Sequence, residues 1–280
     1  MTFILSLGNP DQYIQISDRR LSSNGKSVDD DYNKAGILLT KDARHIFGFT
    51  GLARYGNFET KRWLLESLFQ CCAPDYQINK IAKRLKEKAN KDFKTHPVLR
   101  NMDPAHKRLG IIFSGYNYYM QPPLGALGIL TNYQDFQINE NDPPGRDLEE
   151  AREEFVMHYW SEKRPLDHSY TSIQYVGNWR AFDMAEEPRL RKLLQERRST
   201  TAIVNKAVST IRKMADRSQS QGSIGKNISV CILERDQTSH VEGQYYSALK
   251  TPKTYKPDFV IGISDSIRDV IENTAQPGIE

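Results

Sequence analysis

The stretch MTFILSLGNPDQYIQISDRR, residues 1–20, decides the fold. It holds two short apolar runs, and the residues between them, 8–11, have strong turn chemistry. This pattern predicts a β-hairpin. Asp18 and Arg20 lie at the end of the second strand, so they are expected beside Thr2, at the start of the first strand.

Thr2 has the chemistry of a nucleophile if it becomes the first residue of the mature protein. A small residue after Met1 normally permits removal of the methionine. A free N-terminal threonine then carries a hydroxyl nucleophile and, in its own α-amine, a base. The amine has a pKa of about 7.7 to 8.0, so a useful neutral fraction exists near neutral pH.

The next fifty residues supply groups that could assist Thr2. Lys34 precedes the apolar run 36–40, and a buried lysine near Thr2 would lower the pKa of its hydroxyl. Asp18 would keep that lysine charged and in position. Gly51 lies where a strand ends and a helix begins, and a backbone N–H at such a turn can stabilise an oxyanion. Successive strand residues alternate faces, so the residue after Asp18, Arg19, is expected to face outward.

With these residues in register, the chain resembles the proteasome β-subunit family of N-terminal nucleophile hydrolases, which includes the bacterial proteasome-like peptidases. That family has an N-terminal threonine, an acid-x-arginine element on the second strand, a lysine at the start of the third and a glycine turn into the first helix. The matching positions are Thr2, Asp18, Arg20, Lys34 and Gly51. Each residue alone would be an ordinary strand, surface or turn residue; their joint register carries the resemblance.

The second half of the family pattern is looser. The resemblance places Asp216 and Ser223 near the threonine, where they would orient the amine and a catalytic water; Ser218 and Ser220 compete for the serine role. A Gly-Ser-Gly turn of the family falls at Gly177-Asn178-Trp179. Asn178 is assigned to substrate binding, and its amide can hydrogen-bond but cannot relay a proton as a hydroxyl can.

The order of elements predicts an α+β fold, a four-layer αββα sandwich of two stacked, mainly antiparallel sheets flanked by helices. Predicted strands lie near 2–7, 12–17, 36–40, 45–50, 108–115, 125–131, 169–177, 227–234 and 243–248, and predicted helices near 57–72, 77–93, 185–197 and 200–216. Residues 133–167 are interpreted as a surface insertion with a short helix over 148–159. The tail, polar from about 265, is expected to hold a weak strand over 259–263 and a short helix.

Composition favours a single domain over residues 1–280, because 280 residues with 38% hydrophobic content can bury one substantial core. No apolar stretch approaches the roughly 20 residues that span a bilayer, so no membrane association is expected. Cys71, Cys72 and Cys231 offer no disulfide framework, which fits a reducing compartment and a cytoplasmic location. No spacing of cysteines or histidines suggests a metal site, and no cofactor is expected.

The net charge is +4, and much of the basic charge lies in the lysine-rich segment 80–94. Such a segment could bind nucleic acid. Because no aromatic residues interleave with the lysines and acidic residues interrupt them, we interpret the segment as a solvated outer helix face and expect no nucleic-acid partner.

The leading hypothesis is an amide-bond hydrolase, in particular a threonine peptidase of the proteasome-like group. The expected substrate is a peptide or a small amide, and the resemblance implies a homo-oligomer that could form a ring. Two alternatives stay open. The same centre could serve a non-peptidase amidohydrolase that acts on a small acyl amide, or the chain could be a catalytically silent assembly or binding protein that keeps the fold.

Overall fold

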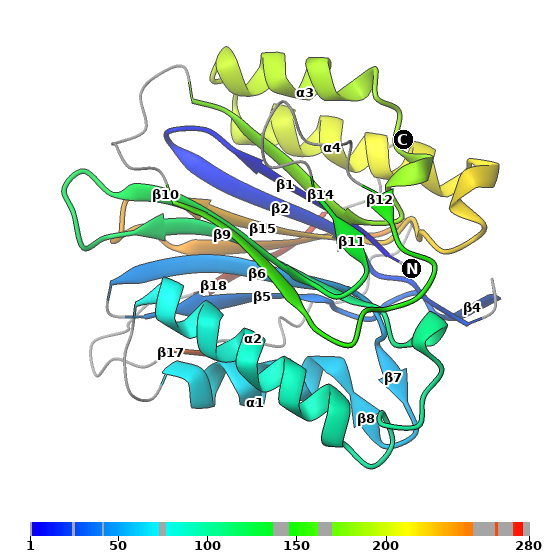
Figure 1. Cartoon of the computed structure of the whole chain (residues 1–280). Helices are drawn as coiled ribbons and strands as arrows, with labels where there is room; N and C mark the ends of the chain where they lie inside the picture. The colour runs from blue at the N-terminus through cyan, green and yellow to red at the C-terminus, as the bar shows by residue number, and fades with distance from the viewer. Residues whose placement is uncertain are drawn as a thin grey trace.

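The fold is seen in a computed structural model, which describes residues 2–23, 26–40, 42–72, 77–136, 146–161, 170–248, 261–262 and 271–276. Two six-stranded sheets are stacked face to face, with a pair of helices on each outer side (Figure 1). This is the predicted αββα sandwich, and the fold class is confirmed.

The first sheet contains the N-terminal hairpin at its centre. Its strands, in spatial order, are β14 (Ser172–Gly177), β1 (Phe3–Gly8), β2 (Gln12–Asp18), β15 (Ile228–Glu234), β16 (Val241–Tyr246) and β18 (Ile271–Gln276). All neighbours are antiparallel except β16 and β18, which run parallel. The helices α3 (Glu186–Gln195) and α4 (Thr200–Ala215) cover its outer face.

The second sheet has the order β13 (Val156–Ser161), β10 (Leu124–Thr131), β9 (Leu109–Asn117), β6 (Ala43–Gly51), β5 (Ala35–Leu39) and β17 (Ile261–Gly262). The helices α1 (Thr60–Cys72) and α2 (Ile78–Thr95) cover it (Figure 1). Short two-stranded ribbons pair β3 (Leu21–Ser23) with β4 (Lys26–Asp29), β7 (Arg54–Tyr55) with β8 (Phe58–Glu59), and β11 (Gln134–Asp135) with β12 (Arg146–Asp147). Single 3₁₀ turns occur at Pro104–His106, Trp179–Ala181 and Ser218–Ser220.

Helix α4 shows why these layers form. Ser199 caps its N-terminus by accepting a hydrogen bond of 3.3 Å from the amide of Ala202. One face of the helix is buried, and its apolar residues recur at helical spacing: Ile203, Val204, Ala207, Val208, Ile211 and Met214. They pack on apolar side chains of β1, β2 and β15 in a single cluster. Full burial of a large aliphatic side chain of this kind stabilises the fold by roughly 1.5–3 kcal/mol.

The prediction of a short helix over 148–159 is wrong. Residues 148–155 form neither helix nor strand, and 156–161 form strand β13 instead of the end of a helix. The strand pairs antiparallel with β10, with Met157 opposite Leu130, so the edge of a sheet imposes the extended conformation. Residues 137–145 and 162–169 of the predicted insertion lie outside the described residues.

The tail was expected to hold a strand and a short helix. Of the expected strand, Ile261–Gly262 is present as β17. The other described part of the tail is strand β18, which pairs with β16. Residues 263–270, which follow the expected strand, lie outside the described residues, so the short helix stays a prediction. No helix of the described ranges is long and apolar enough to cross a membrane.

His45 predicts a specific pH dependence of stability. It is 1% exposed, its Nε2 lies 3.3 Å from Oδ1 of Asn117, and burial lowers its pKa to about 4. In the unfolded chain histidine binds a proton below a pKa of about 6.5. Between these two values the unfolded state binds more protons, so the free energy of unfolding should fall as the pH is lowered from 6.5 to 4, by at most about 3 kcal/mol.

Urea unfolding of the wild type and of His45→Gln at several pH values tests this expectation. The variant should show a flatter dependence in this window, whatever its stability at pH 7. An equal slope in both proteins would show that His45 is not the responsible group.

Candidate active site

The register of the N-terminal hairpin places Asp18 beside the start of β1. Ile4 pairs with Ser17, and the backbone amide of Phe3 donates a 2.9 Å hydrogen bond to Oδ2 of Asp18. The other carboxylate oxygen accepts from the amides of Arg20 at 2.9 Å and Gly225 at 3.1 Å. The Asp18 side chain is fully buried. Three backbone amides therefore hold one carboxylate at the edge of the site.

Lys34 connects this carboxylate to Thr2. The residue directly precedes β5, and its side chain is only 2% exposed. Its Nζ hydrogen-bonds with Oγ1 of Thr2 and with the carbonyl oxygen of Arg20, and lies 3.6 Å from Oδ1 of Asp18. Burial lowers the pKa of the Lys34 ammonium, and the negative charge of Asp18 acts in the opposite direction.

The backbone of Thr2 is held on its other side. Its carbonyl oxygen accepts hydrogen bonds of 2.9 Å from Oγ1 of Thr50 and 3.0 Å from the amide of Asn178. Thr2 is 4% exposed. Sequence reasoning missed Thr50, although it directly precedes the expected turn glycine, Gly51. The Thr2 hydroxyl is thus fixed toward Lys34 by contacts from both sheets.

Gly51 ends β6 at a backbone conformation that requires glycine. Its φ is +96°, and a Cβ there would lie 2.2 Å from the carbonyl oxygen of Arg108. The same carbonyl accepts a 2.7 Å hydrogen bond from the amide of Leu52. Gly177 has a similar role beside Thr2: its φ is +99°, and a Cβ there would lie 1.8 Å from the Thr2 carbonyl oxygen. Both turns are therefore fixed by close backbone approach.

Gly51→Ala is expected to destabilise the protein by about 1–3 kcal/mol or more, because the backbone at Arg108, just before β9, must move to admit the methyl group. Gly56→Ala is the matched control. Its φ is +55°, and the added Cβ would first meet a side-chain atom, Cγ1 of Val98 at 3.2 Å. Thermal unfolding should show a larger decrease in the unfolding temperature for Gly51→Ala than for Gly56→Ala. Equal decreases would contradict the assigned turn geometry.

Asn178 and Ser223 lie together near the carbonyl of Thr2. Nδ2 of Asn178 donates to Oγ of Ser223 at 3.0 Å, and that hydroxyl donates to the carbonyl of Ser220 at 2.6 Å. The hydroxyl of Ser220 bonds to a backbone carbonyl of α4, and that of Ser218 bonds to a neighbouring glutamine. Of these groups, the Asn178 backbone amide is the one bonded to Thr2.

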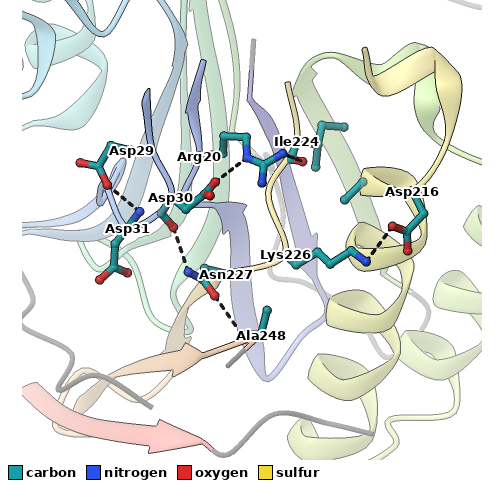
Figure 2. A pocket seen from close by; sticks show the side chains of 10 residues that line it. Arg20, Asp29, Asp30, Asp31, Asp216, Ile224, Lys226, Asn227 and Ala248 are labelled. Carbon is teal, nitrogen blue, oxygen red and sulfur yellow. Dashed lines mark hydrogen bonds and ion pairs between the residues drawn. The ribbon is translucent and has the colours of Figure 1, made fainter. Parts of the chain in front are cut away.

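Asp216 has a different environment from the one expected. Its carboxylate forms a 2.7 Å ion pair with Lys226, and its side chain is 64% exposed. Figure 2 shows this pair across a cavity of about 460 Å³ from Arg20, which pairs with Asp30. None of the contacts found for Asp216 reaches Thr2, so its role at the amine stays a prediction.

Arg19 and Arg20 follow β2 directly, and their side chains anchor this segment to the strand β15 and to the loop before it. Nη1 of Arg20 bonds to the carbonyls of Gly222 and Ile224 at 3.3 and 3.4 Å. The expectation that Arg19 faces outward is wrong: it is 6% exposed, and its guanidinium donates to Oγ of Ser229 at 2.8 Å. Strand β2 ends at Asp18, so the alternation of faces does not continue to Arg19.

The described part of the chain contains no group of three or more histidine, cysteine, aspartate or glutamate side chains that could hold a metal ion. The three cysteines are buried and free.

Comparisons with known proteins bear on the fold. No protein-family model matches the chain, and no curated protein matches it. Among solved structures, the Gly-1 mutant of Anbu from Hyphomicrobium sp. strain MC1 aligns over 89% of this chain and 88% of its own, with 11% identity and a TM-score of 0.52. Another structure of Anbu from that strain covers 88% of each chain, with 12% identity and a TM-score of 0.50. The chain has the fold of Anbu.

The likeness to Anbu agrees with the αββα sandwich that the order of elements predicts. The name stands for ancestral beta-subunit, as in the structure from Yersinia bercovieri, which has 10% identity, a TM-score of 0.49 and coverage of 83% of this chain and 81% of its own. At sequence identities of 10–12%, the likeness shows a shared fold and nothing about the chemistry of Thr2.

Proposed function

We propose that this chain, once Met1 is removed, is an amide-bond hydrolase whose nucleophile is the Thr2 hydroxyl, and in particular a proteasome-like threonine peptidase. The observation that carries the proposal is the buried hydrogen bond between Nζ of Lys34 and Oγ1 of Thr2, with the Asp18 carboxylate 3.6 Å from the same Nζ. A charged ammonium at this position would stabilise the alkoxide form of the hydroxyl.

The proposed mechanism uses groups of this chain. The Thr2 α-amine accepts the hydroxyl proton, directly or through one water, and Oγ1 attacks the substrate carbonyl. The backbone N–H of Gly51 stabilises the resulting oxyanion. The carbon–nitrogen bond then breaks, the leaving amine takes the proton, and water hydrolyses the acyl-threonine ester. Asp18 positions Lys34. The carbonyl of Arg20 also accepts a hydrogen bond from Lys34, and its guanidinium bonds to the backbone carbonyls of Gly222 and Ile224.

The remaining predicted residues would assist the reaction without forming or breaking bonds. Ser223 and Asn178 are hydrogen-bonded to each other, and the backbone amide of Asn178 bonds to the Thr2 carbonyl. Asn178 would contact the bound substrate, while Asp216 and Ser223 would orient the amine and the catalytic water. We propose in addition that residues 1–280 form one domain and that the protein is a cytoplasmic homo-oligomer. The family resemblance implies a ring as its arrangement.

A second candidate is a catalytically silent assembly or binding protein with the same fold. Two observations favour it: Thr2 is 4% exposed, and the contact found for the Asp216 carboxylate is an ion pair with Lys226, not a bond to Thr2. A substrate carbonyl can reach Thr2 only if residues around it move or if the removal of Met1 opens the site.

Hydrolysis assays on protein that begins at Thr2 separate these candidates. Fluorogenic peptide amides test the peptidase, and small N-acyl amides test the non-peptidase amidohydrolase. Thr2→Ala supplies the background rate for both series. Turnover above that background for peptides supports the proposal, turnover for small amides alone assigns the substrate to the second class, and background rates for all substrates favour the silent protein.

A further inference from the structure

A second cavity, away from Thr2, has a strongly basic lining. It has a volume of about 200 Å³ and lies between the end of α2, the loop that follows, and the segments before β9 and β13. Four cationic side chains from these segments line it: Lys94, Arg100, Lys107 and Arg152. A water molecule takes about 30 Å³ in the liquid, so the cavity has room for a small ion.

The positive charge of this cavity is only partly balanced. Glu153 is the one carboxylate among its lining residues. Lys94 and Arg152 have acidic partners outside the lining, since Lys94 lies 3.4 Å from Glu154 and Arg152 pairs with Asp135.

The other two cations have no such partner. Within the described ranges, no hydrogen bond or ion pair engages the guanidinium of Arg100, and no ion pair engages the ammonium of Lys107. Burial lowers the pKa of Lys107, and the charge of Glu153 acts in the opposite direction. Two donors that face one cavity therefore keep unused hydrogen-bonding capacity.

Asn132 holds the backbone at two of the cationic residues. Asn132 is 1% exposed; its Nδ2 donates to the Lys107 carbonyl at 3.0 Å, and its own carbonyl accepts from the Arg152 amide at 2.6 Å. Phe93, which is 2% exposed, contributes to the wall. The side chains of Lys107 and Arg152 thus start from backbone positions that Asn132 holds, which reduces the entropy lost when an anion is bound.

We propose that this cavity binds a small, multiply charged oxyanion, either inorganic phosphate or the phosphate group of a small metabolite. A planar guanidinium and an ammonium that line one cavity offer donors that phosphate oxygens can accept. The cavity is concave and encloses only a small volume, which suits a compact ion better than a polymer. The lysine-rich face of α2, which continues away from Lys94, raises the local concentration of anions.

Isothermal titration calorimetry of the full chain with inorganic phosphate, pyrophosphate and glycerol phosphate, at constant ionic strength set by chloride, tests the proposal. We expect one saturable site per chain. Arg100→Gln and Lys107→Met should each weaken binding about tenfold or more, the effect of losing a charged hydrogen bond. Glu153→Gln should tighten it roughly threefold, the effect of removing one exposed like charge. Tighter binding of glycerol phosphate than of inorganic phosphate would assign a phosphorylated metabolite, and the reverse order would assign the free ion.

Lys83→Met is the matched control, because Lys83 is an exposed lysine of α2 outside the cavity lining. It should leave binding unchanged, and all variants should keep the unfolding temperature of the wild type. The proposal fails if no anion binds saturably, or if Lys83→Met weakens binding as much as Lys107→Met. It also fails if a short single-stranded oligonucleotide binds while phosphate does not, since the lysine face would then be a nucleic-acid surface.

Discussion

Thr2→Ala is expected to abolish hydrolysis while the protein folds as before. The change removes the nucleophile, and the loss should be at least about 10³-fold, down to the background rate of the assay. The rest of the Thr2 environment survives the change, because its carbonyl keeps the hydrogen bonds from Thr50 and Asn178. Rates on the best substrate and thermal unfolding, both on protein that begins at residue 2, measure the two parts of this expectation.

Thr2→Ser is the matched control for this variant. Serine keeps the hydroxyl near Lys34 and lacks only a methyl group, so part of the activity should remain. Full activity in Thr2→Ala would rule out the proposed mechanism, whereas loss of both activity and folding would show only that the residue is structural.

Lys34→Met is expected to reduce the rate by about 10²-fold or more, the low end for loss of an activating group. Methionine fills most of the buried space but cannot stabilise the alkoxide. The variant also leaves the buried carboxylate of Asp18 without its cation, which could cost about 3–5 kcal/mol of stability. Steady-state kinetics and urea unfolding are therefore needed together.

A double variant separates the two effects of Lys34. Asp18→Asn combined with Lys34→Met removes both buried charges, but the new amide nitrogen faces a backbone N–H that the carboxylate accepted. We therefore expect at most a partial return of stability, while activity stays low. Lys26→Met, at an exposed lysine of β4, is the control and should change neither quantity. Recovery of activity in the double variant would show that Lys34 matters only for folding.

The N-terminal hairpin was predictable because its strands and its turn are neighbours in the sequence. The hairpin pairing follows from a two-residue period and a turn, so Asp18 was correctly expected beside the start of β1. The contact of Lys34 with Thr2 joins the two sheets, so it was expected from the family resemblance and not from the local pattern. The helices fall within a few residues of their predicted ends, because their apolar residues recur at helical spacing over many turns.

What could not be predicted depends on partners that are distant in the sequence. Strand β13 takes its conformation from β10, and β18 takes its own from β16. The hydrogen bond from Thr50 to the Thr2 carbonyl joins the two sheets, and no local pattern in the sequence reveals how the sheets stack. Asp216 was placed by resemblance alone, and the structure pairs it with Lys226 at the wall of a neighbouring cavity.

The most direct test of an activated Thr2 is the intact mass of the protein, prepared so that it begins at Thr2, before and after incubation with a β-lactone that acylates N-terminal threonine. Opening of the lactone by the hydroxyl adds the full mass of the reagent. We predict one adduct per chain, mapped to Thr2 by peptide sequencing, absent in Thr2→Ala and strongly slowed in Lys34→Met. An unmodified mass for the correctly processed, folded protein would contradict the claim that Lys34 and Asp18 activate this threonine.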